Sequence, residues 1–168
     1  MRSLLVIAAG LLMLACTALW AADLPKISDI EGLTKGSLLD KVNKSLADQQ
    51  IKDGQFEFKT GKAEFAAGNE KRVNGLLKIL TENSKTLKTA FSTLHVTAEG
   101  HTDADGSAAA NQNLSVARAK KVCAALKAKG MKLPCTATGV GSAKPHVSPE
   151  KSAADKQRNR RVLVQIAK

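Results

Sequence analysis

Apolar and polar positions recur with helical or strand-like periods along most of the chain. Leucines and valines spaced three or four positions apart predict long helices over residues 69–85 and 111–129. Alternation of apolar and polar side chains predicts strands instead, over residues 56–58, 94–100, 135–139 and 161–166. A short helix is expected over residues 152–158. Because strands alternate with helices, the pattern predicts crossover units and a sheet with helices packed on it.

Residues 1–22 have the three-part layout of a bacterial secretory leader. Arg2 precedes an apolar run over residues 4–14, which is too short to span a membrane comfortably as a helix. Two processing routes are open: Cys16 could become the lipidated N-terminus of a lipoprotein, or ordinary signal peptidase could cut within residues 18–22. Both routes predict a periplasmic protein, either free or tethered to a membrane such as the outer membrane.

The remaining chain divides into a tether and a folded domain. Residues 23–54 are polar and interrupted by glycines and Pro25, so they are expected to form a tether with a short helix over residues 37–49. The folded domain is expected over residues 55–168. About 35 residues would then separate the leader from the domain.

The composition limits the partners. The formal net charge of +11 favours an anionic partner such as anionic lipid or a cell-wall polymer, although a well-solvated basic surface explains it too. Aromatic residues make up 3% of the chain and tyrosine is absent, which disfavours stacking of bases or aromatic cofactors. An exported protein rarely meets nucleic acid, and no cofactor is expected.

The cysteine count fits an oxidising compartment. Once Cys16 is removed or lipidated, Cys123 and Cys135 remain, and a disulfide between them is plausible. Two buried free thiols are the alternative. The three histidines are scattered without metal-ligand spacing, so no metal site is predicted.

Arg118 interrupts the apolar face of the helix expected over residues 111–129. It lies four positions after Leu114 and four before Val122, and a charge facing the core is unfavourable unless it is paired. Asp103, just after the strand expected at 94–100, is the natural partner. The two could share a pocket and bind a ligand that carries both an ammonium and a carboxylate. They could also form a simple internal salt bridge, which spacing alone favours.

Several motifs stand in a particular order and spacing over residues 56–166. They are Phe58-Lys59-Thr60-Gly61, Glu99-Gly100-His101-Thr102-Asp103, Asn111, Leu114-Ser115, Arg118-Ala119, Gly139-Val140-Gly141 and Asn159-Arg160-Arg161. Together they resemble the OmpA-like peptidoglycan-binding domain family. The resemblance implies an α+β fold, a β-α-β-α-β sandwich in which a mixed sheet has helices packed on one face.

The resemblance also implies a function and a site. The function is non-catalytic binding of peptidoglycan, which would anchor an envelope protein or complex to the cell wall. Asp103 and Arg118 match the family residues that hold the free end of meso-diaminopimelate in the stem peptide. Further ligand-binding residues are expected around them: Thr102, Asn111, Leu114, Phe58, Thr60 and Gly61. Envelope proteins are further candidate partners, and the membrane would be contacted only through a lipid on Cys16.

The chain departs from the family pattern at Lys59, Ala110 and Lys156, which puts affinity and fine selectivity in question. The segment over residues 83–93 is longer than the corresponding segment usually is in the family, and it has no assigned role. His101 is expected to be structural, and Glu99 is expected to pair across the sheet, with Arg160 or Arg161. The rival functions are a wall-acting hydrolase or its accessory, and a basic periplasmic scaffold without its own ligand site.

Overall fold

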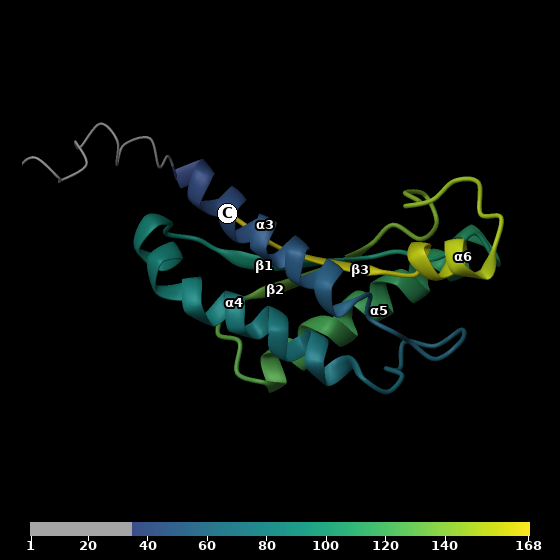
Figure 1. Cartoon of the computed structure of the whole chain (residues 1–168), viewed down its shortest axis with the longest axis horizontal. Helices are drawn as coiled ribbons and strands as arrows, with labels where there is room; N and C mark the ends of the chain where they lie inside the picture. The colour runs from purple at the N-terminus through teal and green to yellow at the C-terminus, as the bar shows by residue number, and fades with distance from the viewer. Residues whose placement is uncertain (1–34) are drawn as a thin grey trace, which may run out of the picture. The chain divides into compact units, whose positions relative to one another are not determined.

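The computed structural model describes residues 35–168 (Figure 1). The predicted leader and Cys16 lie outside the described residues. The elements follow one another as α3 (Lys35–Asp53), α4 (Asn69–Ala90), β1 (His95–Gly100), α5 (Ala108–Ala128), β2 (Cys135–Gly139), α6 (Ala153–Asn159) and β3 (Val162–Ala167). No helix in this part of the chain combines the length and the apolar character needed to cross a membrane.

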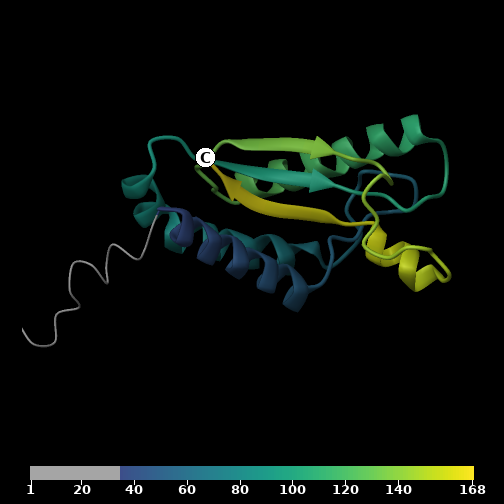
Figure 2. The ribbon, with the colours of Figure 1, turned by 90° about the horizontal axis from the view of Figure 1, so that it is seen from above.

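The strands form one mixed sheet in the order β2-β1-β3. β1 runs parallel to β2 and antiparallel to β3, and Ala98 pairs with Ala137 on one side and with Val164 on the other. One face of the sheet is buried: Val96, Ala98 and Val164 are each 0% exposed. Figure 2 shows α5 running along β2 and α3 running along β3. The predicted α+β fold with a mixed sheet is therefore confirmed.

Two glycines allow α5 to lie unusually close to the sheet. A Cβ at Gly100 would stand 2.0 Å from the carbonyl oxygen of Ser115, and one at Gly139 would stand 2.2 Å from Ser115 Oγ. Ser115 is 0% exposed, and its Oγ also accepts a hydrogen bond from the N–H of Gly141 at 3.0 Å. These contacts fix the first half of α5 over the C-terminal ends of β1 and β2.

The predicted strand over residues 56–58 is not part of the sheet. Phe58 forms a single antiparallel bridge with Phe65, and the backbone N–H of Lys59 donates to the carbonyl of Glu64 at 2.9 Å. Phe56 is buried and stacks on Phe65, with ring centroids 5.9 Å apart. The alternating pattern here therefore reflects aromatic packing on a turn.

A helix covers the edge of the sheet at β3. Side-chain amides of α3 pair with the backbone of β3: Asn43 donates to the carbonyl of Ile166 at 3.0 Å and accepts from its N–H at 2.7 Å. Gln50, two helical turns later, bonds Val164 in the same way at 3.1 and 2.8 Å. The free hydrogen-bonding groups of an edge strand are thereby satisfied without another strand.

The position of α3 differs from the sequence prediction. Residues 37–49 were expected to form a short helix within a tether, whereas α3 extends over Lys35–Asp53 and packs on the domain. Val42 and Leu46 are 3% and 0% exposed and join the hydrophobic core. The compact unit therefore begins at Lys35.

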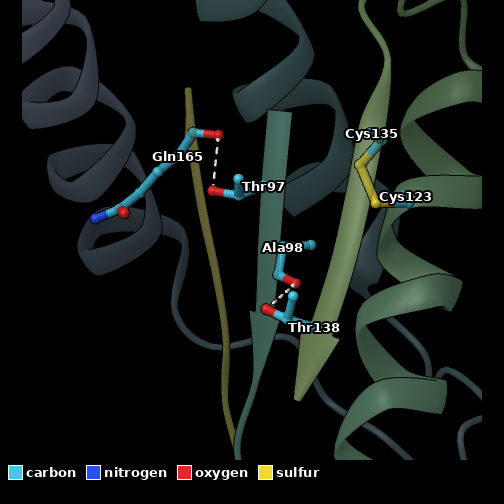
Figure 3. The surroundings of a disulfide bond; sticks show 6 residues. All are labelled: Thr97, Ala98, Cys123, Cys135, Thr138 and Gln165. Atoms are coloured by element: carbon cyan, nitrogen blue, oxygen red, sulfur yellow. Dashed lines mark hydrogen bonds between the residues drawn. A yellow bond between two sulfur atoms is a disulfide. The ribbon is translucent and has the colours of Figure 1, made fainter. Parts of the chain in front are cut away.

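A disulfide joins α5 to β2. Cys123 and Cys135 are bonded through their Sγ atoms, with their Cα atoms 5.8 Å apart (Figure 3). Of the two sequence-based alternatives, the structure contains the disulfide. The bond holds the second half of α5 to the start of β2, just as the glycine contacts hold the first half to the strand ends.

Candidate functional site

A cavity of about 460 Å³ lies at the C-terminal end of β1, where the 58–62 loop, the start of α5 and the end of α6 meet. All eight residues that the sequence assigned to the ligand site line it: Phe58, Thr60, Gly61, Thr102, Asp103, Asn111, Leu114 and Arg118. Four further residues, which the sequence did not assign to the ligand site, complete the lining: Asp105, Gly106, Gln157 and Arg160.

Asn111 organises the loop that carries Asp103. Its side-chain amide donates to the carbonyls of Asp103 and Asp105, at 3.3 and 2.9 Å, and the residue is 5% exposed. Ser107 then caps α5 by accepting the N–H of Ala110 at 3.2 Å. The role of Asn111 is thus partly to shape the loop.

Asp103 forms an ion pair with Arg160, which follows α6. Arg160 Nη1 lies 2.5 Å from Asp103 Oδ2, and Asp103 is 9% exposed. Glu99 was expected to pair with Arg160 or Arg161, but Arg160 pairs with Asp103 instead, and within residues 35–168 no ion pair joins Glu99 to Arg161. One feature of the sequence could have predicted the observed pair: Arg160 lies just before β3, and Asp103 lies just after β1. Since those strands are antiparallel neighbours, the two residues meet at one end of the sheet.

Arg118 is buried beside the cavity, and no carboxylate of the described part of the chain pairs with it. It is 2% exposed, its Nε donates to the carbonyl of Lys62 at 3.2 Å, and its Cζ lies 5.0 Å from the ring centroid of Phe58. Within residues 35–168 it forms no ion pair, so the simple Asp103–Arg118 salt bridge is absent. Burial lowers the pKa of Arg118 and the neighbouring Arg160 lowers it further, whereas Asp103 acts in the opposite direction.

Thr102 presents a buried hydroxyl to the cavity. The residue is 2% exposed, and its Oγ1 makes no hydrogen bond within residues 35–168. A buried hydroxyl without a partner is destabilising by about 1–3 kcal/mol. Because Thr102 lines the cavity, a bound ligand could supply the missing hydrogen bond.

The rim of the cavity carries a second ion pair. Lys156, one of the departures from the family pattern, lies 2.7 Å from Asp105. The hydrogen bond that Lys156 donates to the Asp105 carboxylate raises the pKa of Lys156. The lysine thus neutralises Asp105, and Glu150 supports the same loop by accepting the N–H of Ala104 at 3.2 Å.

His101 and Glu99 lie outside the set of cavity-lining residues. His101 is 1% exposed, and burial, followed by the charge of Arg161, lowers its pKa. Its Nε2 lies 3.2 Å from Glu99 Oε1, and Lys144 pairs with the same carboxylate at 3.6 Å. Among residues 35–168, no group of three or more acidic, histidine or cysteine side chains is arranged to hold a metal ion.

The sequence profile of the OmpA family matches residues 57–160, which is more than half of the chain. No curated protein sequence matches this chain.

Solved structures share the fold at low sequence identity. A MotB-like protein from Desulfovibrio vulgaris is 19% identical with a TM-score of 0.53, covering 79% of this chain and 92% of its own. The peptidoglycan-associated lipoprotein from Burkholderia pseudomallei is 22% identical with a TM-score of 0.53, covering 67% and 87%. The cell wall anchor of the type VI secretion system from Pseudomonas aeruginosa is 23% identical with a TM-score of 0.54, covering 76% and 97%.

Proposed function

This chain belongs to the OmpA family, and we propose from that premise that it binds peptidoglycan through the free end of diaminopimelate without cutting the polymer. The observation that carries the proposal is the buried guanidinium of Arg118, which has no carboxylate partner within residues 35–168 and lines a cavity. A buried cation of this kind favours an anionic ligand group.

The charges inside the cavity suit a zwitterion. The carboxylate of Asp105 is neutralised by its pairing with Lys156. Two guanidinium groups, of Arg118 and Arg160, then line the cavity together with one remaining carboxylate, that of Asp103. The inner cavity therefore has an excess of positive charge that a ligand carboxylate would balance. Arg118 would receive that carboxylate through its terminal nitrogens, in a bidentate arrangement.

The ammonium of the ligand would bind Asp103. Arg160 bonds Oδ2 of this carboxylate, and no hydrogen bond from residues 35–168 is made to Oδ1. The unpaired hydroxyl of Thr102 adds a third polar contact in the same cavity. The free end of diaminopimelate carries one ammonium and one carboxylate on one carbon, which matches these three groups. A lysine side chain carries only the ammonium.

The setting proposed for this activity is the periplasm, where the domain would anchor an envelope protein or complex to the wall. Two of the solved structures with the same fold are those of a peptidoglycan-associated lipoprotein and of a cell wall anchor. Attachment through a lipidated Cys16 and release as a free periplasmic protein remain alternative forms of this proposal.

Co-sedimentation with purified sacculi tests the proposal. Wild-type protein should pellet with sacculi, whereas Asp103→Ala and Arg118→Ala should remain in the supernatant. The matched controls are Glu82→Ala and Lys120→Ala, which remove the same charges from exposed positions away from the cavity. Equal pelleting of the cavity variants and their controls would contradict the assigned site.

The rival functions give different results in the same experiment. A hydrolase would release soluble muropeptides from the sacculi on prolonged incubation, and a binding domain would release none. A scaffold that lacks its own ligand site would not pellet even as the wild-type protein.

A further inference from the structure

A second cavity, of about 660 Å³, lies at the opposite end of the sheet from the proposed wall site. It is lined by residues at the end of α4, at the start of β1 and just before β2, among them Lys88, His95 and Lys132. β1 has six residues and therefore separates the two cavities by about 20 Å. Residues 83–93, which the wall-binding proposal does not use, contribute the end of α4 and one wall of this cavity.

The first described residue, Lys35, lies at this same end. Asn43 of α3 bonds Ile166 near the end of β3, and α3 begins two helical turns earlier, at Lys35. His95, which lines the cavity, pairs with Ala167. Figure 2 shows the start of α3 and the start of β1 at one end of the domain, and α6 at the other.

The cavity combines positive charge with an apolar floor. Lys88 and Lys132 are exposed, and neither forms an ion pair within residues 35–168. Both lysines also line an adjoining hollow of about 90 Å³, so they stand between two depressions. Leu94 and Leu133 form the floor, at 8% and 6% exposed, and Phe91 is half-buried beside them.

We propose that this cavity binds the phosphate headgroup of an anionic phospholipid, so that the end of the domain opposite the wall site lies against a membrane surface. The two lysines would pair with the phosphate, and the exposed hydroxyls of Ser92 and Thr93 would bond the polar part of the headgroup. Phe91 and the leucine floor would contact the first carbons of the lipid chains. A free phosphate ion would leave this apolar floor unused, which is why a lipid fits better.

Vesicle flotation tests this proposal with the full chain carrying Cys16→Ser, which cannot be lipidated. Vesicles of phosphatidylcholine alone measure any binding through the apolar N-terminal segment. Vesicles that also contain phosphatidylglycerol measure the additional binding that depends on anionic lipid. Lys88→Ala combined with Lys132→Ala should weaken the phosphatidylglycerol-dependent affinity about 25-fold, because each lysine near an anionic surface contributes about fivefold. Thermal unfolding of each variant checks that the fold is retained.

The matched control is Lys120→Ala combined with Lys151→Ala, which removes two exposed lysines that form no ion pair within residues 35–168 and line neither hollow. This control should lose less than about threefold in affinity. Equal losses in the two double variants would show that diffuse charge alone attracts the membrane and would overturn the proposal. Binding that does not depend on phosphatidylglycerol would overturn it too, as would release of the protein by inorganic phosphate at constant ionic strength. Sacculus binding should be unchanged in all of these variants, so the two proposals can fail separately.

Discussion

Replacing Arg118 with methionine should separate ligand binding from stability. Arg118 is 2% exposed, bonds only the carbonyl of Lys62 among residues 35–168, and lies over the ring of Phe58 at 5.0 Å. Methionine keeps an unbranched apolar stem that can pack on the same ring, but it removes the charge. If Arg118 is retained for binding, its loss should abolish binding with little loss of stability.

The magnitudes follow from the contacts. Arg118→Met loses one hydrogen bond, about 1 kcal/mol, from a carbonyl that belongs to an exposed residue. It also loses a cation–π contact of about 1 kcal/mol. Replacing a buried ionic group with an apolar one of similar volume ranges from neutral to stabilising by about 4 kcal/mol. The free energy of unfolding should therefore change by between about −2 and +2 kcal/mol.

Binding should change far more. With methionine in place of Arg118, a ligand carboxylate would be buried without its partner, which costs about 3–5 kcal/mol. Affinity for sacculi should fall at least about 100-fold.

Urea unfolding measures the change in the free energy of unfolding for Arg118→Met, and co-sedimentation measures the change in its affinity for sacculi. A loss of about 3–5 kcal/mol in the free energy of unfolding would show that Arg118 belongs to a structural ion pair, and unchanged sacculus binding would show that it does not contact the ligand. Either result would refute the reasoning.

Asn43→Ala or Gln50→Ala should each lower the free energy of unfolding by about 1–3 kcal/mol, because each leaves backbone groups of β3 without partners, and hydrogen exchange of the β3 amides should accelerate. Reduction of the Cys123–Cys135 disulfide, which closes a sequence separation of 12 residues, should lower the free energy of unfolding by about 3 kcal/mol in urea titrations; an unchanged value would indicate that the cysteines are free thiols. Burial lowers the pKa of His101 below its ordinary value of 6.5, so the unfolded chain binds a proton that the folded chain does not. Stability should therefore fall as the pH drops below about 6.5, and His101→Gln should flatten this dependence between neutral and mildly acidic pH.

The apolar periods of the sequence predicted most of the elements because they report packing directly. α4, α5 and β1 lie close to their predicted ranges, and Arg118 was identified from its position within an apolar stripe. The cavity then brings together all eight residues taken from the family motifs. Their contact with a ligand remains a prediction.

Other features depend on contacts that periodicity does not report. The alternation at Phe56 and Phe58 looks like a strand, but these rings pack against Phe65 across a turn. The polar composition of α3 suggested a tether, although its Asn43 and Gln50 are the residues that bond the edge of β3. Such long-range polar pairing cannot be read from local spacing.

The partner of Asp103 was missed for the same reason. Arg160 lies 57 positions away in the sequence, and only the antiparallel pairing of β1 and β3 brings the two together.

The most direct test of the central claim compares two soluble stem peptides in calorimetric titrations of the full chain. One carries meso-diaminopimelate at its third position, and the other carries lysine there. The diaminopimelate peptide should bind, and the lysine peptide should bind at least about 100-fold more weakly because it leaves the buried guanidinium of Arg118 unpaired. Equal affinity for the two peptides would contradict the assignment of Arg118 to the second carboxylate.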